Sequence, residues 1–494
     1  MNITKRQTSV LDSQLVNSLP SSVELGMLNS LLLLIGVIGL ATANPLPSVF
    51  AMLQLKVLLT CYWRKGVPPV VVLLFLIPWL EISTGILQAN LSGISLNELL
   101  NGNGETAYWL SCIGLYAVHF GFYPIFKSVP LAPIEKLKEF AQRTSLNRLI
   151  LLYFAIGPTT GLIASFLGKG SALMQIITYF NEVSLVVLIT ICLRQMLLKE
   201  FTRVYFGFLG FVLITSFYSF FSEWRVLFFA IFIAYGTYTT IDKRAVFRIA
   251  FLALFVGNLL FMWQAIKPIY RAYLTGEKEQ VGMLKSQGVS IERKEALDRF
   301  FGLAVDFYSG ELLGDSNSAQ EQLLEGTLSR IGYLDFFSRT LEKVPYQIEH
   351  EEGNLLLSNL SFALIPRFLN SKKGVKDDGA KVQKYTGFMV SDSASFSLGH
   401  YTEYYIDFGK YFMMLPLFIL GFLGGKIYRF AVNSVSKNYN PLFLSGFIFA
   451  FLNEWGSFQN DAIWIYGLTF FGFICHGFVF RIIYNAIDKI SHVK

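Results

Sequence analysis

The segment 395–409, which reads SFSLGHYTEYYIDFG, places two carboxylates and an imidazole where a long polar stretch meets an apolar one. Glu403 and Asp407 are four residues apart, so both can lie on one face of a helix, with His400 one turn earlier. A carboxylate or an imidazole at the edge of a membrane is placed to act as a general base. The alternative interpretation is structural, because the helix dipole favours acids in a first turn.

A second group of residues is basic and suits anion binding. These residues are Arg330, Arg339 and Arg367 in the loop, with Lys372 and Lys373 beyond, and Arg225 and Arg271 are expected at the outer edge of the membrane. Arg367 follows the apolar segment 355–365, so its guanidinium is expected near the bilayer plane, where it can hold a phosphate through two parallel hydrogen bonds. The alternative is an interfacial arginine that extends to lipid headgroups.

Three ionisable residues fall inside apolar segments, namely His119, Glu182 and Glu454. A charged group at that depth needs a partner or a polar cavity, and it is often functional. The alternative for each is a hydrogen bond that holds two helices together.

The composition is that of a membrane protein with many spans. Of the 494 residues, 53% are hydrophobic and only 15% are charged, against about a quarter in soluble domains. The net charge is +7, but residues 265–403 are slightly acidic, so the basic excess lies in short connections. There it sets membrane orientation and gives no indication of nucleic-acid binding. The four cysteines lie in or beside apolar segments and predict neither a disulfide framework nor a zinc site.

The hydropathy pattern predicts about twelve transmembrane helices, each near the length needed to cross a hydrocarbon core of about 30 Å. They are expected at 28–43, 49–63, 67–87, 107–126, 149–167, 172–196, 204–221, 226–240, 246–265, 411–430, 441–454 and 463–484. Basic connections alternate with connections poor in Lys and Arg, one of which is expected to carry Glu81. This alternation predicts that both termini are cytoplasmic and that the large loop lies outside.

The chain is thus expected to divide into transmembrane helices at 1–264, an extracytoplasmic loop at 265–403 and transmembrane helices at 404–494. Within the loop, helices are predicted at 291–305, 327–344 and 355–365. The last is too short to span and is expected along the membrane surface. The pattern at 372–384 predicts a mobile segment. The expected fold class is an all-α polytopic membrane protein with one large, mainly helical extracytoplasmic loop.

Motifs of soluble enzymes are missing from the sequence, which has no Walker sequence, no GxSxG and no HExxH. A DxD pair, the usual metal clamp for nucleotide-sugar donors, is also missing. We therefore predict no metal site and no cofactor.

The segment 330–425 resembles the Wzy-type polysaccharide polymerases, the bacterial O-antigen or oligosaccharide repeat-unit polymerases. Three blocks carry the resemblance: SRIGYLDFFSRTLEKVPYQIEHEEG, LIPRFLNSKKG and SLGHYTEYYIDFGKYFMMLPLFILGFLGG. They cover about a fifth of the chain, and the rest agrees only in architecture. The family's proline after the lysine of the second block is missing here, which makes Lys372 a less secure match.

The resemblance implies a metal-independent glycosyltransferase of the bacterial inner membrane. Its substrate would be a glycan repeat unit on undecaprenyl pyrophosphate, polymerised on the outer face of the cytoplasmic membrane into O-antigen, capsule or exopolysaccharide. A chain-length regulator, a flippase and membrane lipids would be its partners. Arg330 and Arg367 would bind pyrophosphate or sugar, with Tyr404, Arg225 and Arg271 as further substrate contacts.

Glu403 would orient or deprotonate the acceptor hydroxyl, with His400 as the alternative base and Asp407 as a third catalytic candidate. Other functions remain open from the sequence. A flippase or transporter would show a charge-lined path and two related halves. An O-antigen ligase would share the chemistry and differ in acceptor. A structural assembly partner would leave Arg367 and Glu403 without a role.

Overall fold

The structure is a computed structural model of the chain. It describes residues 22–63, 68–100, 102–129, 134–166, 172–218, 224–238, 293–309, 332–365, 378–388, 397–452, 455 and 460–492, with scattered positions between 251 and 273.

Regular structure in these residues is helical, apart from one isolated bridge between Thr144 and His492. The helices before the large loop are α2 (Ser22–Leu40), α3 (Pro45–Tyr62), α4 (Val70–Leu91), α5 (Leu96–Leu99), α6 (Gly104–Lys127), α7 (Ile134–Arg143), α8 (Leu146–Phe166), α9 (Ala172–Leu198), α10 (Arg203–Tyr218) and α11 (Trp224–Tyr238). Those of the loop and the C-terminal part are α13 (Arg293–Ser309), α15 (Leu334–Lys343), α16 (Asn354–Leu364), α17 (Asp378–Thr386), α18 (His400–Phe412), α19 (Met414–Asn438), η1 (Pro441–Phe443), α20 (Leu444–Leu452), α21 (Ala462–Ile474), the π-helical turn η3 (Cys475–Val479) and α22 (Arg481–Ser491).

Six of the described helices are long and apolar enough to cross a membrane. They are α3, α4, α6, most of α9, most of α19, and α21 continued through η3. Every predicted span overlaps helical structure, except the one at 246–265, most of which lies outside the described residues. The span predicted at 441–454 meets only the short η1 and α20, and the one at 463–484 runs over α21, η3 and the start of α22. The chain is therefore an all-α protein with apolar helices of membrane-spanning length, and the full count of about twelve crossings stays a prediction.

Helices α6 and α19 pack with their backbones in close approach. A Cβ atom added to Gly421 of α19 would lie 2.1 Å from the carbonyl oxygen of Val118, and one added to Gly121 of α6 would lie 2.2 Å from that of Phe418. Membrane helices associate largely through such small-residue contacts, because lipid offers no hydrophobic driving force for burying apolar side chains. Glycine at these positions therefore sets the α6–α19 distance, and α18 continues directly into α19.

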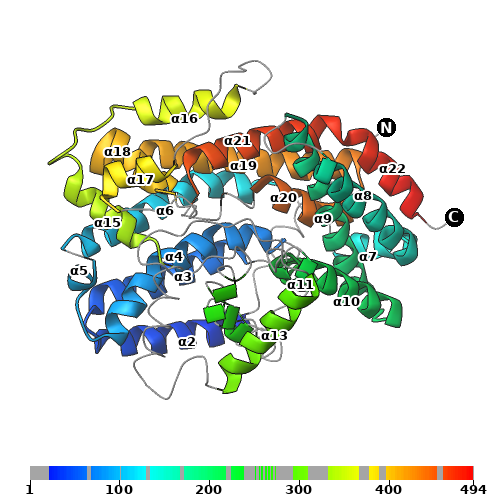
Figure 1. Ribbon diagram of the computed structural model, residues 1–494, viewed down its shortest axis with the longest axis horizontal. Coiled ribbons are helices and arrows are strands. Elements are labelled where there is room, and N and C mark those ends of the chain that lie inside the picture. The colour runs from blue at the N-terminus through cyan, green and yellow to red at the C-terminus, as the bar shows by residue number, and fades with distance from the viewer. Residues whose placement is uncertain are drawn as a thin grey trace.

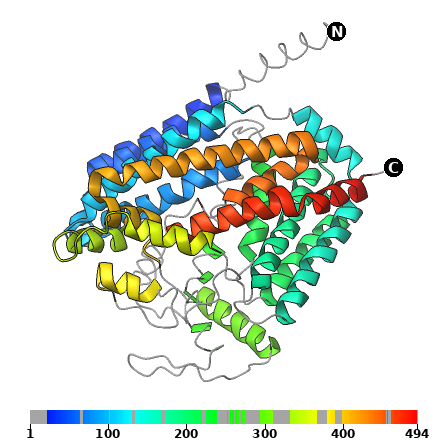
Figure 2. The same ribbon diagram turned by 90° about the horizontal axis from the view of Figure 1, so that it is seen from above.

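Two sets of helices lie at opposite ends of the long axis of the molecule, α5, α15, α17 and α18 at one end and α7, α10 and α22 at the other (Figure 1, Figure 2). At one end, the Thr144 carbonyl accepts a hydrogen bond from Arg194, at 2.6 Å, and the Thr144 hydroxyl contacts Asn440. The backbone N–H of Ser145 donates to the carbonyl oxygen of Ser491 at 2.7 Å. Three connections that the charge pattern predicts to be cytoplasmic, between α6 and α8, between α9 and α10 and between α19 and η1, thus share one end with the C-terminal tail, while α5, α15, α17 and α18 lie at the other.

The loop helices agree with the sequence in part. Helices α13 and α16 lie where they were expected, and α15 covers the later part of 327–344. The prediction of a mobile segment at 372–384 was wrong for 378–384, which form most of α17, and residues 372–377 lie outside the described residues. Glu81 was expected in a connection but lies inside α4 and is buried. The proposed boundary between 403 and 404 falls within α18.

Candidate functional site

Helix α18 is a short helix whose first two turns are almost completely buried. It begins after Gly399, at a φ of 77° that suits glycine, and it bends at Gly409, at a φ of 71°, where it meets α19. It packs against α6, α15, α16 and α19. Glu403, His400 and Asp407 therefore lie inside the protein and not on a solvated helix entrance.

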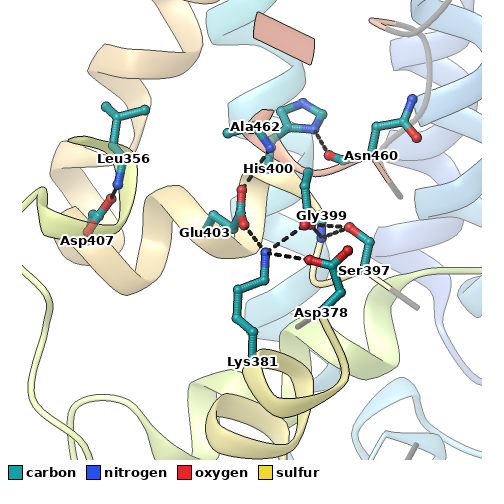
Figure 3. A network of polar contacts seen from close by, with 11 residues as sticks. Leu356, Asp378, Lys381, Ser397, Gly399, His400, Glu403, Asp407, Asn460 and Ala462 are labelled. Carbon is teal, nitrogen blue, oxygen red and sulfur yellow. Dashed lines mark hydrogen bonds and ion pairs between the residues drawn. The ribbon is translucent and has the colours of Figure 1, made fainter. Parts of the chain in front are cut away.

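Glu403 is the centre of a buried ion cluster, and only 1% of its surface is exposed. One carboxylate oxygen forms an ion pair with the ammonium of Lys381 from α17, and the other accepts the backbone N–H of Ala462 at 2.8 Å. Figure 3 shows Lys381 rising from α17 toward Glu403, with Ala462 on the other side of the carboxylate. Both oxygens of Glu403 are thus held by donors from elements distant in the sequence.

Asp461, which immediately precedes α21, is the second carboxylate of this cluster. Its Oδ2 lies 2.6 Å from the Lys381 ammonium, while Oδ1 accepts the Ser397 hydroxyl and, at 3.3 Å, the Gly399 N–H. Asp378 lies farther from the ammonium, at 3.9 Å. Asp461 therefore ties the start of α18 to the start of α21.

The charge state of Lys381 follows from two opposing effects. Its side chain is 9% exposed, and such burial by itself would lower the pKa of a lysine. Glu403 and Asp461 outweigh that burial, so the pKa of Lys381 is raised above its ordinary value. Lys381 is therefore a positively charged ammonium at any physiological pH. Its charge partly compensates the negative charges of the two buried carboxylates.

The acidic cluster extends toward the membrane-spanning helices through Tyr333. The backbone N–H of Tyr333 donates to the carbonyl oxygen of Glu81 in α4, at 3.4 Å. The pKa of Tyr333 is raised by burial first, and then by the charges of Asp461, Glu403 and Glu81. The Tyr333 phenol thus lies near all three carboxylates.

His400 is held by the chain segment before α21. Its ring Nδ1 lies 3.0 Å from the carbonyl oxygen of Asn460, and its backbone N–H donates to the same oxygen at 2.9 Å. Burial lowers the pKa of His400 to about 4, although Asn460 and the charge of Asp461 favour the protonated ring. The imidazole is therefore neutral at neutral pH, and with Nδ1–H donating to Asn460 its basic nitrogen is Nε2.

Asp407 has a different environment from Glu403, although both come from α18. Its carboxylate accepts the backbone N–H groups of Leu355 and Leu356 at 3.0 and 2.7 Å, so it caps the first turn of α16. Burial raises the pKa of Asp407, and these backbone donors partly counteract the rise. The carboxylate is engaged in positioning α16, and its catalytic role stays a prediction.

Of the substrate contacts that the resemblance implies, only Tyr404 has a side chain within the residues that the structure describes. The hydroxyl of Tyr404 is buried and lies 2.6 Å from that of Tyr466, and burial raises the pKa of Tyr404 well above its usual value. Its role in substrate binding stays a prediction. The candidates outside the described part are Arg271, Arg330, Arg367, Lys372 and the side chain of Arg225.

The intramembrane candidates have partners that the sequence did not identify. His119 of α6 contacts the Tyr62 hydroxyl through Nδ1 at 2.9 Å. Glu182 of α9 lies 3.1 Å from Nε2 of His476. Glu454 falls outside the described residues. Both described residues are therefore paired across helices.

Sequence reasoning missed Lys381, Asp461 and His476. Asp461 carries a weak local signal, since an acidic residue directly before the apolar segment 463–484 is typical of a helix start. Lys381 is one of several lysines in a polar segment and has no such signal. Within the residues that the structure describes, no three His, Cys, Asp or Glu side chains are grouped to hold a metal ion.

Comparison of the chain with protein-family models, with curated proteins and with solved structures found no match.

Proposed function

We propose that the chain is a membrane glycosyltransferase that polymerises glycan repeat units carried on undecaprenyl pyrophosphate, at the outer face of the bacterial cytoplasmic membrane. The observation that carries the proposal is the Glu403 carboxylate. It is buried at the end of the apolar helices where the loop helices α15 and α17 lie, and it is held by Lys381 and the Ala462 N–H. The blocks that resemble the Wzy-type polymerases include α15 and α18; α18 carries this carboxylate, and α15 packs against α18.

The proposed reaction needs a base and a cation close together. The acceptor hydroxyl oxygen attacks the anomeric carbon of the donor, the bond from that carbon to the pyrophosphate oxygen breaks, and undecaprenyl pyrophosphate leaves. The hydroxyl proton passes to Glu403 or to Nε2 of His400. Cations stabilise the charge on the leaving pyrophosphate, for which Arg330 and Arg367 are proposed.

Both oxygens of Glu403 already accept hydrogen bonds, so one of these bonds must be lost before the carboxylate can act as a base. Hydrogen bonds to a carboxylate reduce its basicity. The Ala462 donor is fixed backbone, whereas Lys381 is a flexible side chain that already shares its ammonium with Asp461. A pyrophosphate that draws the ammonium away from Glu403 would release the oxygen that takes the proton, so donor binding would prepare the base.

The test uses purified full-length protein and lipid-linked repeat units. Glu403→Gln keeps the size of the side chain and removes its basicity, so turnover should fall by roughly 10²–10⁴-fold, the usual contribution of a positioned base. Donor binding should not weaken, because Arg330 and Arg367 remain and the Lys381 ammonium is held less strongly. The matched control is Glu351→Gln, because Glu351 pairs with Lys384 of the same helix α17 but is partly exposed. Full polymerisation by Glu403→Gln would remove this residue from the reaction.

A deletion strain separates the alternative functions. Loss of a polymerase should leave surface lipid capped with single repeat units. Loss of a ligase should leave long chains on the lipid carrier, and loss of a flippase should leave lipid-linked units on the cytoplasmic side. Either of the last two results would contradict the proposed polymerase.

A further inference from the structure

A second buried polar cluster lies at the other end of α21, within the apolar helices. His476 occupies the π-helical turn η3 and has no exposed surface. Its Nδ1 lies 2.7 Å from the hydroxyl of Tyr484 in α22, and its Nε2 lies 3.1 Å from a carboxylate oxygen of Glu182 in α9. We call Glu182, His476 and Tyr484 the intramembrane triad. It joins residues that are far apart in sequence into one hydrogen-bonded chain.

The triad is distant from the Glu403 cluster. Ala462, whose N–H binds Glu403, is the first residue of α21, and His476 lies about four turns later along nearly continuous helix. At 1.5 Å per residue this is a separation of about 20 Å. The triad is therefore a second site, and its chemistry is independent of the proposed glycosyl transfer.

The described surroundings of His476 are largely apolar. The rings of Phe447, Phe451 and Phe480 contact the imidazole at centroid distances of 6.4, 5.7 and 5.3 Å. The π turn is closed by the Phe480 N–H, which donates to the Cys475 carbonyl at 2.7 Å. Such turns are uncommon in helices and are frequently found at functional sites, because the extra residue redirects the side chains that follow. Here the turn directs His476 between α9 and α22.

The arrangement of heavy atoms accommodates two protonation states. With an ionised Glu182 and a neutral ring, Nδ1–H donates to the Tyr484 oxygen and Nε2 faces the carboxylate. After one proton is added between the carboxylate and Nε2, the ring donates to both partners, and the Tyr484 oxygen accepts in both states. The added proton turns a pair with one net negative charge into a neutral pair, which is the less costly state in apolar surroundings.

Glu182 is the only member of the triad with an exposed surface. Its side chain is 25% exposed, whereas His476 and Tyr484 are fully buried. Cys475 of η3 lies near Glu182, and the ring of Tyr439, before η1, lies 5.7 Å from that of Tyr484. Arg481 of α22 lies near Tyr439, and Tyr179 of α9 lies near Gly472. Helix α20 contributes phenylalanine rings. Glu182 and His476 are the pair in direct contact.

We propose that Glu182, His476 and Tyr484 form a proton-binding site inside the membrane-spanning bundle, which takes up one proton through Glu182 and holds it between the carboxylate and the imidazole. The ligand is a proton, and its binding requires no rearrangement of the three side chains.

The experiment follows the protonation of the pair directly. Full-length protein carrying isotope-labelled histidine is placed in lipid nanodiscs, and the ring nitrogens are observed by solid-state NMR as the pH is lowered. The chain has five histidines, so few signals overlap. Infrared difference spectra report the carboxyl groups under the same conditions. We expect the His476 ring to gain a proton in step with a change in the Glu182 carboxyl signal.

Variants assign the signals and supply the control. Glu182→Gln should abolish the carboxyl change and shift or remove the His476 titration, and Tyr484→Phe should alter Nδ1 while proton uptake persists. The matched control is Asp488→Asn, because Asp488 forms a second carboxylate–imidazole pair, with His492 at the same 3.1 Å, but one that is partly exposed. It should change only the His492 signal.

The proposal is overturned if His476 and Glu182 each keep one protonation state throughout the pH range in which the protein stays folded. The triad would then be a fixed structural contact between helices. The titration of the unaltered protein decides between these outcomes even if Glu182→Gln fails to fold.

Discussion

At the scale of single residues, the candidate site depends on Lys381. The ammonium of this lysine contacts both Glu403 and Asp461, and all three side chains are buried. A buried charge that loses its partner is strongly destabilising, since neither water nor a counter-ion replaces the lost contact. The residue therefore has a structural role in addition to the part proposed for it in freeing the base.

Lys381→Met should lower the free energy of unfolding by roughly 3–5 kcal/mol, the usual cost of breaking a buried ion pair. The matched control is Lys384→Met, which removes an ammonium of the same helix that is 52% exposed and pairs with Glu351. Lys384→Met should lower the free energy of unfolding by no more than about 1 kcal/mol. Thermal unfolding in detergent measures both variants. Equal stability of the two would contradict the buried cluster.

The pH dependence of stability provides a test of His400. Its pKa is about 4 in the folded chain against 6.5 for an ordinary histidine, so the unfolded chain binds the proton more readily. The contribution of the neutral ring is fully present above the unfolded pKa of 6.5, and it is lost as pH falls toward about 4. His400→Asn should remove this part of the acid lability, which unfolding curves at several pH values will detect. An unchanged acid transition would show that the buried neutral ring is not its source.

At the scale of elements, α18 is positioned by contacts at both of its ends. Gly399 and Ser397 bind Asp461 at its start, and Asp407 caps α16 near its end. Since α18 leads directly into α19, the distance between α19 and α6 also affects where Glu403 lies. Close packing between glycines and backbone is therefore a structural requirement of the site.

Gly421→Val should disrupt the α6–α19 contact, because its Cβ atom would lie 2.1 Å from the Val118 carbonyl oxygen, which is backbone and cannot rotate away. We expect a clear loss of thermal stability and of any activity that depends on α18. The control is Gly207→Val in α10, where a Cβ atom meets nothing within 4 Å. If Gly421→Val behaved like the control, the close approach of the two helices would be wrong.

At the scale of the whole molecule, the arrangement has two ends with different chemistry. The basic connections around Thr144 lie at one end, and the helices that carry Lys381 and Glu403 lie at the other. This separation is the one expected if the first end is cytoplasmic, because basic connections are retained on that side. The orientation itself is a prediction.

Single-cysteine labelling tests the orientation. Tyr346, which is 80% exposed, lies in the connection after α15, and Arg143 is an exposed residue at the end of α7. With a membrane-impermeant reagent, Tyr346→Cys should react in intact cells, and Arg143→Cys should react only after permeabilisation. The four native cysteines are buried or half-buried, and the unaltered protein serves as the blank. The reverse pattern would place the Glu403 cluster in the cytoplasm and contradict the proposed outer-face reaction.

The positions of the helices could be predicted from the sequence because hydropathy and periodicity are local properties. Each predicted span within the described residues overlaps helical structure, and α13 and α16 of the loop lie where they were expected. Glu403 and His400 could be singled out because they stand at a boundary between polar and apolar sequence. The same local reasoning failed at residues 378–384. Gly374 and Gly379 suggested a mobile segment, but these residues form most of α17, and the side chain of Lys381 is buried there.

The partners of these residues were decided by tertiary structure alone. Lys381 meets Asp461 across 80 residues, and Glu182 meets His476 across 294. A lysine in a polar segment and a glutamate in an apolar helix carry no sequence signal for such partners, because the pairing depends on which helix ends and faces pack together. The sequence determined which residues can carry charge at the membrane. Packing determined which of those charges compensate one another, because a charge removed from water is tolerated only where a partner is brought to it.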